Sequence, residues 1–114
     1  IYATAPLSGG HLNPAVSLSL ALCQKMAWSK MLAYWVAQVT AGISAGCCYG
    51  ILLAPRTASL GPVAPFEWWH ALIVEVIYTC MLCFVVNNCA ASTRNNASDD
   101  GNQFFALAIG FVIA

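Results

Sequence analysis

The chain of 114 residues is 61% hydrophobic and only 7% charged, with a formal net charge of zero at pH 7. Because soluble domains carry roughly 25% charged residues, this composition excludes an ordinary soluble domain and gives no sign of a nucleic-acid or acidic partner. It indicates an all-α integral membrane protein that crosses the lipid bilayer several times. The sequence starts and stops within apolar stretches, so we expect it to be a fragment of a longer protein.

Residues 8–24 predict a helix that is too short to cross a bilayer. Asn13 is a preferred N-cap residue and Pro14 is tolerated in a first turn, so we expect the helix to begin at Pro14. The apolar run that follows supports about ten residues, or about 15 Å, which is half of a hydrocarbon core about 30 Å thick. Gly9 and Gly10 permit irregular backbone, which a membrane tolerates only where protein buries it or water lines it. We therefore predict a reentrant half-helix beside a path for water or solute.

Two later segments are long and apolar enough to cross the membrane completely. The first covers residues 28–54, and the second covers residues 68–91 and begins with Trp68 and Trp69, an aromatic pair typical of a membrane interface. A loop over residues 55–67 joins the two spans. The other predicted segments are the end of an earlier span at 1–7, a polar loop at 92–102 and the start of a further span at 103–114.

The basic residues predict the orientation of these spans. Those expected on one side of the membrane are Lys25, Lys30 and Arg94. Arg56 alone falls on the other side. Because cytoplasmic loops carry an excess of Lys and Arg, we expect loops 8–30 and 92–102 to lie on the cytoplasmic side.

Residues 8–16 read Ser-Gly-Gly-His-Leu-Asn-Pro-Ala-Val and resemble the first Asn-Pro-Ala loop of the major intrinsic proteins, the aquaporins and aquaglyceroporins. The resemblance continues in the order and spacing of that family. Residues 34–38 followed by Gly42 are similar to its third helix, Glu75 lies in a segment similar to its fourth, and residues 107–111 are similar to the start of its fifth. Nearly the whole chain is covered by this resemblance.

The resemblance implies an aquaporin-like bundle of six transmembrane helices and two half-helices, assembled as a homotetramer with one pore in each subunit. Residues 1–114 would form part of one channel domain, holding the end of helix 2, the first half-helix, helices 3 and 4 and the start of helix 5. The implied function is a passive channel for water and small neutral solutes such as glycerol, with no cofactor. A non-conducting membrane scaffold on the same fold is the alternative, and a secondary transporter with broken helices is a less favoured one.

Asn13 is the central residue of the expected pore. At the positive end of a half-helix dipole, its side-chain oxygen can cap the helix while its NH₂ group meets a passing oxygen atom, which would orient neutral solutes and disfavour cations. The alternative is that Asn13 is only a helix cap. By resemblance, the motif residues are Asn13, Pro14 and Ala15, and the pore-lining residues are Asn13, Gly9, Gly10, His11 and Val16. The carbonyl groups of Gly9, Gly10 and His11 would accept hydrogen bonds from water.

Glu75 is an ionisable residue within the second predicted span, where an acid needs a partner. The resemblance assigns it, together with Gln38, to a buried network that supports the pore loop near His11. The alternative is a protonated acid at a helix interface. A stripe of small residues on the same span as Gln38 predicts close helix packing, and its members are Gly42, Gly46 and Gly50.

The six cysteines do not indicate a metal or redox site. Cys80 and Cys83 have the spacing of a CxxC pair, but they lie within an apolar span and no second pair of ligands follows them. Buried cysteine behaves as a small hydrophobic residue. No HExxH, GxSxG or P-loop sequence is present, so the sequence favours a protein that is not an enzyme and has no catalytic residues.

The orientation can be tested by cysteine labelling of the full-length protein in cells. We expect Ala58→Cys to react with a membrane-impermeant reagent from outside intact cells, and Ala97→Cys to react only after permeabilisation, because the excess of basic residues puts residue 97 in the cytoplasm. The unsubstituted protein reports the background from native cysteines. The opposite labelling pattern would invert the orientation.

Overall fold

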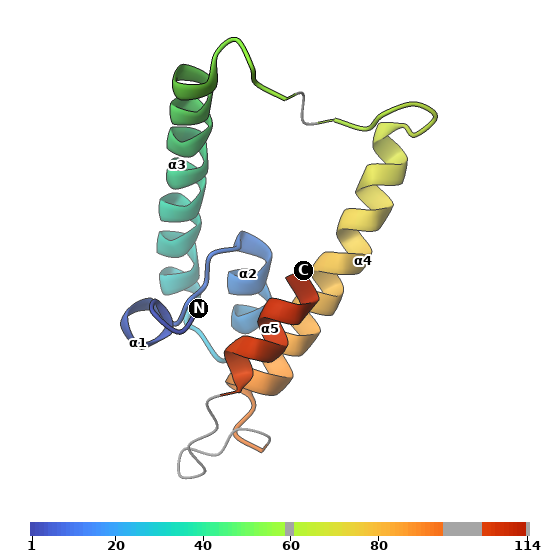
Figure 1. Cartoon of the computed structure of the whole chain (residues 1–114). Coiled ribbons are helices and arrows are strands. Elements are labelled where there is room, and N and C mark those ends of the chain that lie inside the picture. The colour runs from blue at the N-terminus through green and yellow to red at the C-terminus, as the bar shows by residue number, and fades with distance from the viewer. Residues whose placement is uncertain (59–60, 95–103, 114) are drawn as a thin grey trace.

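The computed structural model describes residues 1–58, 61–94 and 104–113, and all regular structure in these residues is helical (Figure 1). The elements are α1 (Ala5–Ser8), α2 (Pro14–Leu22), α3 (Trp28–Leu53), α4 (Trp68–Val86), the π-helix η1 (Asn87–Ala91) and α5 (Phe105–Ile113). The described chain is therefore all-α, with two long helices and several short helical pieces.

The short helix α2 lies between the two long helices (Figure 1). It packs against α3 on one side and against α4 and η1 on the other, whereas α3 and α4 do not contact each other in the described residues. The two long helices diverge from this shared end toward the connection that joins them. Helix α5 packs along α4 and η1. The described fold is thus organised around α2.

The long helices have the length and composition of membrane spans. These spans are Trp28–Leu53, with 26 residues, and Trp68–Ala91, with 24 residues. At roughly 1.5 Å per residue, each is longer than a hydrocarbon core of about 30 Å. Their apolar side chains are mostly exposed, since Met31 is the buried residue of α3 and Val86 is that of α4. Such a continuous apolar surface suits contact with lipid or with further helices.

A small apolar core forms where α2, α4 and α5 meet. Its buried members are Val16 and Leu20 of α2, Val86 of α4 and Ile109 of α5. Val16 and Leu20 are four residues apart and so share one face of α2. This core holds the half-helix against the end of α4.

The segment before α2 reverses direction through two consecutive glycines. Gly9 and Gly10 have φ values of +73° and +70°, a region that residues with a Cβ rarely adopt. Asn13 then caps α2, because its Oδ1 accepts a hydrogen bond from the Ala15 N–H at 2.8 Å, and Pro14 is the first helical residue. The nine residues of α2 extend about 14 Å, roughly half of a hydrocarbon core.

The N-terminal segment differs from the expected end of a long span. Residues 1–7 form a turn and most of the four-residue helix α1, which ends at the left-handed Gly9. Within the segment 103–114, where the start of a further span is expected, the described residues form α5, and its membership of a longer span stays a prediction. Most of the polar loop expected at 92–102 lies outside the described residues.

The second long span also differs from a uniform α-helix. The segment expected at 68–91 changes to a π-helix at Asn87. There the side chains of Asn87 and Asn88 donate hydrogen bonds to the carbonyls of Cys83 and Phe84, each at 2.8 Å. Side-chain donors of this kind share these carbonyls with the backbone N–H groups of the helix.

The two glycines before α2 predict unequal costs for a matched pair of substitutions. A Cβ added at Gly9 would lie 2.8 Å from His11 Nε2, whereas the nearest atom to a Cβ at Gly10 is Ile1 Cγ2 at 3.4 Å. Both changes strain a positive φ, at a cost of about 1–2 kcal/mol, but only Gly9→Ala must also displace the imidazole. We expect Gly9→Ala to lower the melting temperature of the full-length protein in detergent more than Gly10→Ala does.

A His11→Ala background provides the control for this comparison. Without the imidazole, the extra loss of stability caused by Gly9→Ala should disappear, and the two glycine substitutions should cost the same. Equal melting temperatures of Gly9→Ala and Gly10→Ala in the unaltered background would contradict the close approach of His11 to Gly9.

Candidate functional site

One face of α3 holds the reentrant segment through main-chain carbonyls. Three α3 side chains that lie within about one helical turn each donate a hydrogen bond to that segment or to the first residue of α2. The bonds run from Tyr34 Oη to Ser8 O at 2.6 Å, from Trp35 Nε1 to Pro14 O at 2.9 Å and from Gln38 Nε2 to His11 O at 2.7 Å. Ser8 is the last residue of α1 and His11 lies in irregular backbone, so their carbonyls lack a helical partner and α3 provides one.

Gln38 also connects the reentrant segment to the half-helix itself. Its Nε2 donates to Ser17 Oγ at 3.0 Å as well as to the His11 carbonyl. Ser17 is completely buried, and its hydroxyl donates in turn to the Asn13 carbonyl at 3.4 Å. One amide of α3 thus fixes both the loop before α2 and the first turns of α2.

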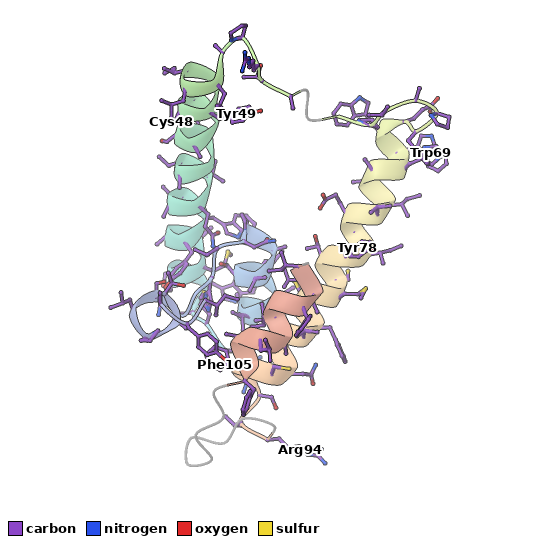
Figure 2. The ribbon with its side chains drawn as sticks, viewed as in Figure 1. Cys48, Tyr49, Trp69, Tyr78, Arg94 and Phe105 are labelled. Carbon is purple, nitrogen blue, oxygen red and sulfur yellow. The ribbon has the colours of Figure 1, made fainter. Side chains whose placement is uncertain are left out.

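A cavity of about 560 Å³ lies between the start of α2 and the helices α4, η1 and α5. The residues expected to line a pore all lie on its wall, namely Gly9, Gly10, His11, Asn13 and Val16. The facing wall is apolar and includes Leu82, Val86, Ala90, Phe105 and Ile109. Figure 2 shows side chains crowded around this end of the structure, where Phe105 begins α5, whereas Tyr49 and Trp69 lie at the far end.

Some polar groups of the residues that line the cavity already have a hydrogen-bond partner in the protein, and others have none in the described residues. Asn13 Oδ1 is occupied by the helix cap, while Asn13 Nδ2 has no hydrogen-bond partner in the described residues. The carbonyls of Gly9 and Gly10 likewise accept no hydrogen bond there. The carbonyl of His11 accepts from Gln38, but a carbonyl oxygen has a second lone pair, so its expected hydrogen bond to water stays a prediction. The residues that line the cavity therefore include one amide donor and two carbonyl acceptors that have no partner in the described residues.

Glu75 lies apart from these groups. It is exposed on α4, and no hydrogen bond joins it to Gln38 or His11 in the described residues. The α4 residues that pack on the apolar core start at Leu82, about two turns beyond Glu75. The structure brings Gln38 and His11 together but does not bring Glu75 to them, so its expected supporting role stays a prediction.

The small-residue stripe of α3 also has no neighbour in the described chain. A Cβ added at any of its three glycines would have no atom within 4 Å. These positions are Gly42, Gly46 and Gly50. Their role in helix packing stays a prediction that concerns surfaces outside the described residues.

Several residues of the site were not singled out by the sequence. Tyr34 and Trp35 were counted as part of a family-like segment and not as donors to the reentrant loop. Their position about one turn before Gln38, on the same side of the helix, could have indicated that they bind the same segment.

Asn87 was also missed, although its Nδ2 donates to Ser19 Oγ at 3.1 Å and so joins η1 to α2. No local pattern marks a contact between residues so far apart in sequence.

Comparisons with known proteins place this site in a family. The family model described as "Major intrinsic protein" matches residues 1–114. The chain is 36% identical over 114 residues to Aquaporin NIP2-2 of Zea mays, covering 99% of this chain and 37% of that relative. It is 30% identical over 131 residues to Aquaglycerol porin AQY3 of Saccharomyces cerevisiae, covering 100% of this chain and 20% of that protein. No solved structure gives a significant match.

The chain therefore spans only about a third of the length of the plant aquaporin that it matches. The family match nevertheless extends over every residue of the chain, including the reentrant segment, both long helices and the facing wall of the cavity. Members of this family are channels of the lipid bilayer and not enzymes. On these grounds the chain belongs to the major intrinsic protein family, the aquaporins and their relatives.

Proposed function

We propose that the full-length protein is a passive transmembrane channel for water and small neutral solutes such as glycerol. The observation that carries the proposal is the way Asn13 uses its two amide atoms. Asn13 lines the cavity, its Oδ1 caps α2, and its Nδ2 has no hydrogen-bond partner among the described residues. That NH₂ group can donate to the oxygen of a passing molecule, which can then donate to the carbonyl of Gly9 or Gly10.

The same arrangement disfavours ions. The N-terminus of α2 carries the positive end of a helix dipole, and Asn13 presents a donor to the cavity. Most of the other lining side chains are apolar, so they cannot replace the hydration shell of a cation and do little to screen the dipole field. Lys25, which also lines the cavity, adds a positive charge to this barrier.

We extend the proposal to the orientation and assembly of the protein. Figure 2 has Trp69 and Arg94 at opposite ends of the structure, and α3 begins at the end where α4 finishes. This separation supports cytoplasmic placement of loops 8–30 and 92–102. We also propose a homotetramer, in which the glycine face of α3 packs against helices outside the described residues.

Replacing the amide of Asn13 by a carboxylate tests the channel mechanism. Asn13→Asp keeps an oxygen that can cap α2 but puts a negative charge where the proposal needs a donor. We expect proteoliposomes of the full-length variant to leak protons or monovalent cations roughly tenfold more than the unaltered channel, an effect of about 1.4 kcal/mol. Stopped-flow light scattering measures the water flux, and an entrapped pH dye measures the proton leak.

The matched control is Asn88→Asp, because Asn88 does not line the cavity. It should leave both the water flux and the leak unchanged. Unaltered water flux and unaltered leak in Asn13→Asp would show that Asn13 is only a helix cap.

Glu75 and Gln38 are proposed to support the pore loop in the assembled protein. An acid within a span requires a hydrogen-bond partner, so we expect Glu75→Leu to lower the yield of folded tetramer, while Glu75→Gln, which can still make hydrogen bonds, retains most of it. Size-exclusion chromatography in detergent measures the yield. A normal tetramer yield and normal water permeability in Glu75→Leu would remove Glu75 from the supporting network.

A further inference from the structure

Asn87 joins two elements that are far apart in the sequence. It lies where α4 passes into η1, and its Nδ2 donates to Ser19 Oγ of α2 at 3.1 Å and to the Cys83 carbonyl at 2.8 Å. Ser19 Oγ in turn donates to the Val16 carbonyl at 3.0 Å. The Asn87–Ser19 bond thus connects the half-helix α2 to the cavity wall formed by α4 and η1.

Both residues of this bond are next in sequence to a residue that lines the cavity. On α2, Leu20 lines the cavity and Ser19 precedes it; on the other element, Val86 lines the cavity and Asn87 follows it. Neither Ser19 nor Asn87 lines the cavity itself. The bond therefore joins the two elements beside cavity-lining residues without adding a polar group to the cavity lining.

Amide groups hold α2 on both flanks. On the α3 side, Gln38 donates to Ser17, and on the η1 side, Asn87 donates to Ser19. The two serines are two residues apart, so they face nearly opposite sides of the helix. Because α3 and α4 do not contact each other in the described residues, these two amides, the bond from Trp35 to the Pro14 carbonyl and the apolar core set the position of α2 between them.

The position within the helix does not by itself explain why Asn87 bonds to α2. Its neighbour Asn88 makes the same kind of bond to the carbonyl four residues back, at the same distance of 2.8 Å, with no bond to α2. Asn87 also keeps its Oδ1 buried without a partner, which costs free energy. It stands at the first residue of a π-helix, and such single-turn irregularities occur often at functional sites.

We infer that Asn87 is a positioning residue of the channel: through Ser19 it fixes the half-helix against the α4–η1 wall and so sets the width of the cavity beside Asn13. This inference rests on the proposed channel function. A change in width affects solutes of different size unequally. Loss of the bond therefore changes the ratio of solute to water permeability more than it changes the amount of folded protein.

The test compares Asn87→Ala, Ser19→Ala and the double variant in proteoliposomes of the full-length protein, with Asn88→Ala as the matched control. Each preparation is measured for both glycerol and water permeability, and their ratio does not depend on how much channel was reconstituted. We expect Asn87→Ala and Ser19→Ala each to change this ratio by about threefold or more, as loss of one net hydrogen bond allows. The double variant should change it no further than either single variant does, and Asn88→Ala should leave it unaltered.

The possible results separate this inference from the proposed function. An unaltered channel that conducts water, together with equal ratios in Asn87→Ala and Asn88→Ala, overturns the positioning role alone. Additive effects in the double variant also overturn it, because the two residues would then act independently.

If Asn87→Ala is not recovered in folded form, the comparison of Ser19→Ala with Asn88→Ala decides instead, because Ser19→Ala removes a single hydroxyl. An unaltered protein that passes no water overturns the channel proposal and the inference with it.

Discussion

The structure depends on one constraint: main-chain carbonyl groups in irregular backbone need hydrogen-bond donors where little water is present. A chain that enters a membrane and turns back has no helical ladder at the turn. Here one face of α3 donates hydrogen bonds to the carbonyls of Ser8 and His11 and to that of Pro14, the first residue of α2. Gly9 and Gly10 line the cavity, and their carbonyls accept no hydrogen bond in the described residues. The carbonyls that α3 holds and the carbonyls without a partner therefore belong to different residues.

This separation also explains the mixed character of α2. Its serines face the flanking elements and bind Gln38 and Asn87, while Val16 and Leu20 face the cavity and the apolar core. A half-helix with only apolar side chains could slide along its neighbours, because dispersion contacts have little directional preference. Directed hydrogen bonds from the two amides and from Trp35 give it one position. The apolar residues of α2 then supply buried contact area, and its polar residues fix its position along the neighbouring helices.

The sequence predicted the parts of this fold that depend on local signals. The Asn13–Pro14 pair marked the start of α2, and the apolar runs at 28–54 and 68–91 correspond within one residue to the two helical segments that are long and apolar enough to be spans. It did not predict the donors Tyr34 and Trp35, since aromatic residues near the end of an apolar run are equally suited to a lipid interface. It could not predict the contact of Asn87, because its partner Ser19 lies 68 positions away. The neighbours of Glu75 also depend on tertiary packing, so composition and local sequence patterns could not predict them.

The partners of the half-helix differ greatly in their distance along the chain, and this difference has a consequence for biosynthesis. The bonds to α3 span 21 to 27 residues, whereas the bond to η1 spans 68. A ribosome adds roughly 5–20 residues per second, so Asn87 is made about 2–10 seconds after Gln38. During that interval the reentrant segment can already dock on α3, with its loop carbonyls satisfied. Helix α4 and η1 can then pack against an α2 that is already held by α3. The elements would therefore assemble in the order in which they are synthesised.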